Sequence, residues 1–208
     1  MLAEDLLMLL HDPGTGRPLI HSSKVDLALG GAVLAELTER RRIELTDRHR
    51  VTRNRTVIVV DPAPTGDDVL DEALHRIAAR PATRSHVVVS RISKGVRGRL
   101  LDRLVGRGLL RAGDSRFAGV FPMRAWLAVD SGHTRELRRD LHRVLHCERP
   151  PTREEAVIIS LLHAVGRTAD VVGDAGLGRR ELQRRAKAVA ERDAAGEAVR
   201  QALHAAAF

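Results

Sequence analysis

The sequence is poor in aromatic residues and in cysteine. Its 208 residues include one tryptophan, three phenylalanines and no tyrosine. The hydrophobic core must therefore be aliphatic, and there are few aromatic side chains to stack on single-stranded nucleic acid. The single cysteine, Cys147, excludes an internal disulfide framework and indicates a reducing compartment.

A long apolar run at the start of the chain is also missing. The first ten residues, MLAEDLLMLL, carry acids where a signal peptide carries positive charge, and their apolar stretch is too short to cross a bilayer. We expect a cytoplasmic protein that, if it meets a membrane, is peripheral to the inner face.

What the chain has in abundance is arginine. The formal net charge is +8, which favours a polyanionic partner such as nucleic acid or an anionic membrane. Arginine- and alanine-rich composition is also typical of GC-rich genomes, so local basic clusters are more informative than the total charge. A hydrophobic content of 43% is enough for one core, and we expect a single globular domain over residues 1–208.

The spacing of apolar residues predicts a mainly α-helical fold. The segment from Val157 to Val165 is apolar nearly all round, which places its helix in the middle of the protein. Val87–Val89 is ambiguous between helix and strand. The expected helices cover residues 2–11, a segment beginning at 21–24, residues 97–105, residues 135–147, a segment from Thr152, and a long segment from Leu182 to the C-terminus.

Two of these helices carry capping signals, and one carries paired glycines. Ser23 with Asp26 predicts a variant capping box, and Thr152 with Glu155 predicts a regular one. Gly30 and Gly31 lie inside the second helix, where each costs about 1 kcal/mol relative to alanine. We therefore expect close packing, or close approach of a ligand, at these two positions.

Two short β-hairpins are also expected. Residues 40–45 and 56–60 read as the strands of the first. Residues 109–111 and 117–121 read as the strands of the second, with a turn at Gly113-Asp114 and an end at Pro122.

The stretch from Asp61 to Leu74 ends one element and begins another. Its two prolines stop the preceding strand, and Thr65 is predicted to cap the next helix with Asp68 returning the hydrogen bond. Asp67 complements the helix dipole. Capping and dipole roles explain these carboxylates without catalysis.

Signs of enzymatic chemistry are weak. His142 and His146 lie four residues apart beside Cys147 and Glu148, which is part of a zinc-site pattern. A fourth ligand is missing, so a solvated or hydrogen-bonded histidine pair is favoured, and His163 reads as a hydrogen-bonded residue of a buried helix. The sequence has no nucleophile elbow, phosphate-cradling loop or dinucleotide fingerprint. We predict no catalytic residue, no metal and no cofactor, and we expect a protein that is not an enzyme.

The segment Ser93–Arg99, SKGVRGR, places basic residues at a helix N-terminus, where free backbone N–H groups already favour an anion. Lys94 and Arg97 are three residues apart and are expected to share a face. A solvated basic face is the simpler interpretation, and a phosphate-bearing partner is the sharper one.

The run Pro64–Asp67 followed by Leu70–Leu74 resembles the signature of the Golgi phosphoprotein 3 family, whose members are peripheral membrane proteins that bind phosphatidylinositol 4-phosphate. Further segments are similar to that family in the same order over nearly the whole chain. They are residues 4–9, 29–37, 99–109 and 160–164.

This resemblance implies a helical fold around a central apolar bundle, with a hairpin used for membrane contact or homo-oligomer formation. Here the hairpin would include Phe117, Val120 and Phe121, which are apolar enough to enter a bilayer interface.

The resemblance also implies a basic pocket for the lipid headgroup. Lys94 and Arg97 match the family's two basic residues before the later helix, whereas His21 stands at its tryptophan and Gly30 at its arginine. The implied ligand is phosphatidylinositol 4-phosphate or another anionic phospholipid. The second ligand would suit a bacterial member, which the arginine- and alanine-rich composition favours.

A nucleic-acid-binding protein is the alternative. The helix and hairpin from Val96 to Met123 are similar in order to a winged helix, and the helix with Arg97 could face a major groove. Gly98, Asp102 and Gly106 leave few side chains there to read bases. An adaptor for protein tails is a third possibility, with no sequence feature that isolates it.

Overall fold

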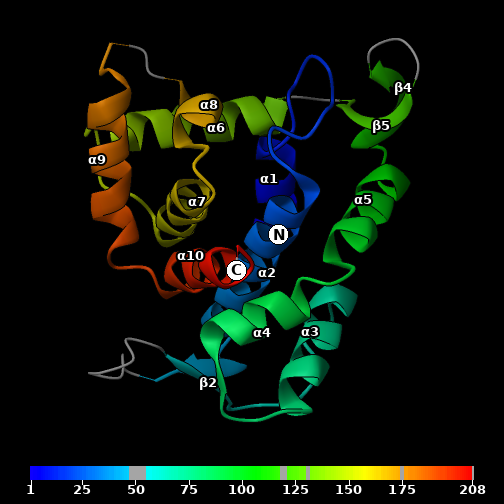
Figure 1. Ribbon diagram of the computed structural model, residues 1–208, viewed down its shortest axis with the longest axis vertical. Coiled ribbons are helices and arrows are strands. Elements are labelled where there is room, and N and C mark those ends of the chain that lie inside the picture. The colour runs from blue at the N-terminus through cyan, green and yellow to red at the C-terminus, as the bar shows by residue number, and fades with distance from the viewer. Residues whose placement is uncertain (47–54, 118–120, 130–131, 174–175, 208) are drawn as a thin grey trace.

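The fold is mainly α-helical, as the sequence predicts. A computed structural model describes residues 1–46, 55–117, 121–129, 132–173 and 176–207, and Figure 1 shows their arrangement. The helices are α1 (Leu2–Leu9), α2 (Ser22–Glu39), α3 (Asp68–Ala78), α4 (Ser85–Ile92), α5 (Val96–Gly106), α6 (Gly132–Leu145), α7 (Arg153–Ala164), α8 (Thr168–Val172), α9 (Arg179–Ala190) and α10 (Ala194–Ala205). The strands are β1 (Ile43–Leu45), β2 (Thr56–Val59), β3 (Thr83–Arg84), β4 (Leu110–Phe117) and β5 (Phe121–Ala128).

Helices α2 and α7 form the centre of the protein. Helix α2 packs against α1, α4, α7 and α10, and α7 buries Ile158, Ile159, Leu161 and Leu162. The capping box predicted for α7 is present, because the Thr152 side chain accepts the Glu155 N–H and the Glu155 carboxylate accepts the Thr152 N–H. One aliphatic core then runs from Leu2 in α1 to Ala202 in α10.

The paired glycines of α2 are sites of close helix packing, which confirms one of the two expectations for them. A Cβ atom on Gly30 would lie 2.8 Å from the Val89 carbonyl oxygen of α4. A Cβ atom on Gly31 would lie 2.7 Å from Leu161 Cδ2 of α7. The missing side chains therefore let α4 and α7 approach the backbone of α2.

The first predicted hairpin is present, with β1 antiparallel to β2 and Ile43 opposite Val59. The two-residue strand β3 adds to its far side. Val87–Val89, ambiguous in the sequence, is part of helix α4.

The second hairpin is longer than predicted. Gly113 and Asp114 lie inside β4, opposite Ala125 and Arg124, so the predicted turn at these residues is wrong. Pro122 does not end the hairpin but pairs with Arg116 within β5. Both strands of a two-stranded sheet are edges, so a proline without an N–H group can be accommodated there.

Two predicted helix ends are also wrong. The cap of α2 is His21, whose Nδ1 accepts the Ser23 N–H, and not Ser23 with Asp26. The long C-terminal helix is divided into α9 and α10, because the Asp193 side chain caps α10 by accepting the Gly196 N–H at 2.6 Å.

Within the described part of the chain, none of the helices combines the length and the apolar character that crossing a membrane requires.

The packing at Gly31 gives a stability prediction. Gly31→Ala should destabilise the protein by about 1–3 kcal/mol, since the new methyl group must displace Val199 and Leu161 or separate α2 from α10 and α7. Urea unfolding measures the change as a lower midpoint at an unchanged slope.

Gly106→Ala is the matched control, because a Cβ atom there meets nothing within 4 Å. It should leave the stability unchanged or raise it by up to about 1 kcal/mol through helix propensity. Equal midpoints for the two variants would contradict the packing role of Gly31.

Candidate functional site

A cavity of about 700 Å³ lies between the loop after α1, the first turns of α5 and strand β5. This size is typical of a small-ligand site. The lining residues that the structure describes include no carboxylate. They are His11, Arg17, Pro18, Ile20, His21 and Ser22 from the loop and the start of α2, Arg97, Gly98 and Leu101 from α5, and Trp126 from β5.

The loop wall is fixed by hydrogen bonds within the loop and to β5. Asp12 Oδ1 accepts the Thr15 N–H at 2.7 Å, which closes the turn after α1. The Trp126 N–H donates to the Gly16 carbonyl oxygen at 2.8 Å. Gly16 has φ +65°, and a Cβ atom there would lie 2.7 Å from the Trp126 carbonyl oxygen. This close approach requires glycine and joins the loop wall to the hairpin.

The wall formed by α5 exposes backbone as well as side chain. Gly95, the residue before the helix, has φ +82° and turns the chain into α5. The Val96 N–H donates to the Ser93 carbonyl oxygen at 3.3 Å, whereas the next N–H groups of a helix start have no partner within the helix. Gly98 lies in that first turn and lines the cavity without a side chain to cover these donors. The helix end therefore adds an electropositive backbone surface to the charge of Arg97.

Arg97 is half-buried and has a carboxylate neighbour behind it. Its Nε lies 3.1 Å from Asp26 Oδ1 of α2. Burial raises the pKa of Asp26, although the charge of Arg97 acts in the opposite direction. One edge of the guanidinium group thus faces α2, while the residue still lines the cavity.

His11 is the buried titratable group of the cavity. Its Nδ1 lies 2.7 Å from the Leu7 carbonyl oxygen, which can only accept, so Nδ1 carries the proton. Burial lowers the pKa of His11, and the charge of Arg97 lowers it further against the hydrogen bond to Leu7. His11 is therefore neutral near pH 7 and leaves Arg97 as a fixed charge.

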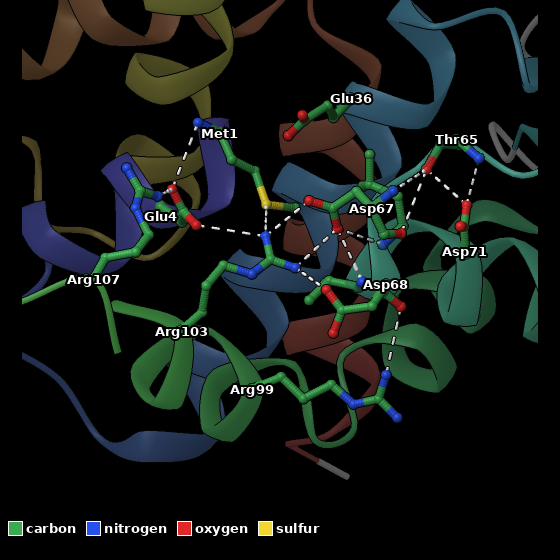
Figure 2. A network of polar contacts seen from close by, with 12 residues as sticks. Met1, Glu4, Glu36, Thr65, Asp67, Asp68, Asp71, Arg99, Arg103 and Arg107 are labelled. Carbon is green, nitrogen blue, oxygen red and sulfur yellow. Dashed lines mark hydrogen bonds and ion pairs between the residues drawn. The ribbon is translucent and has the colours of Figure 1, made fainter. Parts of the chain in front are cut away.

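Arg103, two turns along α5 from Arg97, anchors the helix (Figure 2). It donates to both carboxylate oxygens of Asp67, at 2.8 and 3.1 Å, and also bonds to Asp68. Its Nη1 lies 3.5 Å from the buried carboxylate of Glu4, which Arg107 also contacts at 2.9 Å. This cluster, the Arg103 network, joins α1, α3 and α5.

The Arg103 network determines the ionisation of Asp67. Burial would raise the pKa of Asp67, but the hydrogen bonds from Arg103 and from the Leu70 and Val69 N–H groups lower it below its usual value. Asp67 thus bears a charge that Arg103 compensates.

The cap of α3 differs from the prediction, since Asp67 is the N-cap and Thr65 is not. Asp67 Oδ1 accepts the Val69 and Leu70 N–H groups at 2.9 and 3.1 Å. The Thr65 hydroxyl donates instead to Asp71 at 2.7 Å. Gly66, with φ +82°, turns the chain between them, so the cap falls two residues after the one predicted.

The structure brings two of the four residues assigned to headgroup binding to the cavity. His21 and Arg97 line it, whereas Lys94 is exposed outside its lining. Because α5 begins at Val96, helical spacing does not place Lys94 on the face of Arg97. Gly30 is buried under Val89 and Ser93, so it has no access to the cavity.

Phe117 and Phe121, two of the residues assigned to membrane contact, lie at the end of the second hairpin where β4 ends and β5 begins. Phe117 and Phe121 are paired across β4 and β5. Val120 lies outside the described residues.

Two cavity residues had no signal in the sequence. Arg17 follows a turn, and Trp126 is separated from Arg97 by 29 positions along the chain. Neither is related to Arg97 by helical or strand spacing, so only the tertiary structure brings them together.

Other clusters are less suited to a ligand. A second cavity of about 650 Å³ contains Lys187 and Arg200, but Lys187 lies 4.0 Å from Glu191, and Glu197 also lines that cavity. The rings of His142 and His146 are stacked with centroids 3.9 Å apart. Within the described residues, no group of three or more His, Cys, Asp or Glu residues could hold a metal ion.

Comparison with known proteins identifies the family. The family model described as Golgi phosphoprotein 3 (GPP34) matches residues 2–206. No curated protein matches the chain.

The Arg103 network gives a second stability prediction. Arg103→Met keeps an unbranched stem but leaves Asp67 without its cation and Glu4 with Arg107 in place of two arginines, so it should cost about 2–4 kcal/mol. Arg99→Met on the same helix is the control, because Arg99 is exposed and makes one contact of 3.5 Å, to the Asp68 carbonyl oxygen. It should cost less than about 0.5 kcal/mol. Chemical unfolding of both variants tests this, and equal losses would contradict it.

The buried His11 gives a pH prediction. Its folded-state pKa lies below the unfolded value of about 6.5, so its contribution to stability is present above that pH and is lost as the pH falls. His11→Gln removes this titration. The wild-type melting temperature, relative to that of the variant, should therefore fall between about pH 7.5 and about pH 5.5. A difference that is constant or grows on acidification would contradict the assignment.

Proposed function

The chain belongs to the Golgi phosphoprotein 3 family, and from that premise we propose that it is a non-enzymatic peripheral membrane protein that binds the headgroup of an anionic phospholipid. The bound lipid is phosphatidylinositol 4-phosphate or another anionic phospholipid. The cavity beside Arg97 is the binding site.

The observation that carries this proposal is the charge of the cavity. Its described lining contains Arg17 and Arg97 and no carboxylate, and it includes Gly98 from the first turn of α5. Asp26 lies behind Arg97 and compensates part of its charge. A phosphate group would find both a guanidinium group and helix N–H groups on one wall.

Lys94 has a different part in this proposal. Its side chain is exposed just before α5, and its carbonyl oxygen accepts a hydrogen bond of 2.7 Å from Arg76. An exposed lysine near an anionic surface contributes about 1 kcal/mol without a specific contact. We assign Lys94 to the membrane surface and Arg97 to the headgroup.

The nucleic-acid alternative has less support. Arg103 of α5 is bonded to Asp67 and Asp68, and Arg107 to Glu4. These arginines are occupied by carboxylates within the protein, and Gly98 and Gly106 present no side chain. Helix α5 therefore offers few side chains to bases.

Liposome sedimentation tests the proposal. The wild type should pellet with vesicles of phosphatidylcholine containing phosphatidylinositol 4-phosphate or phosphatidylglycerol, and not with phosphatidylcholine alone. Lys94→Ala with Arg97→Ala should weaken binding by about thirtyfold, since each charge contributes about 1 kcal/mol. The loss should shrink at high salt.

The matched control is Arg180→Ala with Arg192→Ala. It removes the same charge from exposed positions in the first turn of α9 and just after its end. Helix α9 lies on the opposite side of the molecule from α5 and β5 (Figure 1). Equal losses of vesicle binding in the two double variants would show that net charge, and not the cavity, causes the binding. Equal binding of the wild type to neutral and anionic vesicles would refute the proposal. Tight binding to random duplex DNA without vesicle binding would favour the nucleic-acid alternative.

A further inference from the structure

The cavity beside Arg97 has two chemically different walls. Arg97 and the open turn of α5 suit a phosphate, whereas Trp126, Ile20 and Leu101 are apolar. A phosphate alone would leave most of the roughly 700 Å³ filled with water. A ligand that fits the whole cavity has a charged group and a larger body beside it.

Trp126 is the largest side chain of the apolar wall. It is the single tryptophan of a chain with few aromatic residues, yet it is only half-buried and packs at the margin of the core. The structure supplies no acceptor for its indole N–H among the described residues. A tryptophan with an apolar face and a free polar edge is well suited to a ligand that is itself partly polar.

The position of Trp126 is set by its backbone. Its N–H donates to Gly16 at 2.8 Å, and its own carbonyl group lies against the Cα of Gly16, where a Cβ atom would come within 2.7 Å. Within the hairpin it lies opposite Ala112. Trp126 is thus held beside the loop that also bears Arg17 and His21, between the cavity of Arg97 and a smaller cavity that it lines with Met8, Leu110 and Arg138.

We propose that Trp126 is a binding residue of a composite site that takes a phosphorylated polyol headgroup, with the phosphate at Arg97 and the polyol body against the indole. This inference rests on the proposed function and adds the residue that recognises the body of the headgroup. Three separate segments complete the site: the loop after α1, the start of α5, and strand β5. Because β5 belongs to the second hairpin, the headgroup site and that hairpin form one structural unit.

The single tryptophan makes the test possible in the unmodified protein. Its emission should change saturably when the wild type is titrated with soluble glycerophosphoinositol 4-phosphate. Inorganic phosphate at the same concentrations should give no saturable change, because it lacks the body that contacts the indole. An equal response to inorganic phosphate, or no response to the headgroup by a protein that pellets with vesicles, would overturn the role of Trp126.

Two substitutions separate the ring from the fold. Trp126→Ala should weaken vesicle binding roughly tenfold, a loss typical of a buried aromatic contact, while Trp126→Phe should stay within about threefold. Gly16→Ala keeps every lining side chain but displaces the Trp126 backbone, so it should weaken binding as Trp126→Ala does. Melting temperatures identify a variant that fails to fold, in which case the wild-type titration decides.

The outcomes distinguish this inference from the proposed function. A wild type that binds no anionic vesicle overturns both. A wild type that binds anionic vesicles, with Trp126→Ala binding equally well, overturns only the composite site.

Discussion

The position of α5 depends on the pairing of Arg103 with carboxylates of α1 and α3, of which Glu4 is buried and Asp67 partly buried. Asp67 caps α3, Glu4 is buried in α1, and both face the same guanidinium group. Removing this cation would leave the partly buried Asp67 uncompensated and weaken the compensation of Glu4, so Arg103 stabilises the packing of the three helices. Arg97 lies on the same helix as Arg103, and its place in the cavity follows from this anchoring.

The family signature therefore acts indirectly. Asp67 accepts hydrogen bonds from helix N–H groups and from Arg103, and Asp71 accepts one from the Thr65 hydroxyl. None of the carboxylates between Thr65 and Asp71 lines the candidate cavity. Through Arg103 they hold α5, and with it the candidate site, in place. A recognisable sequence can thus identify a family and still lie outside the site that does the chemistry.

Charge is divided between the two halves of α5. Arg103, in its second half, and Arg107, just after its end, are paired with carboxylates of α3 and α1. Arg97, in its first turn, has only the partly desolvated Asp26 behind it and a cavity without carboxylates in front. The same helix is therefore a structural element at one end and a candidate anion site at the other.

The sequence by itself determined most of the helices, the first hairpin, the Thr152 capping box and the close packing at Gly30 and Gly31, because these follow from local periodicity and from the absence of a side chain. It left α4 ambiguous and did not predict α8. It did not determine the Asp67 cap, the break at Asp193 or the length of the second hairpin. For each of these boundaries, several neighbouring residues could cap the helix or end the strand, and tertiary contacts select one of them. The site was predictable only in part. Basic residues before a helix indicate an anion, but whether Lys94, Arg17 or Trp126 lies beside Arg97 depends on how the loop, α5 and β5 pack together. Residues far apart in the chain have no common period, so their meeting is decided by the tertiary structure.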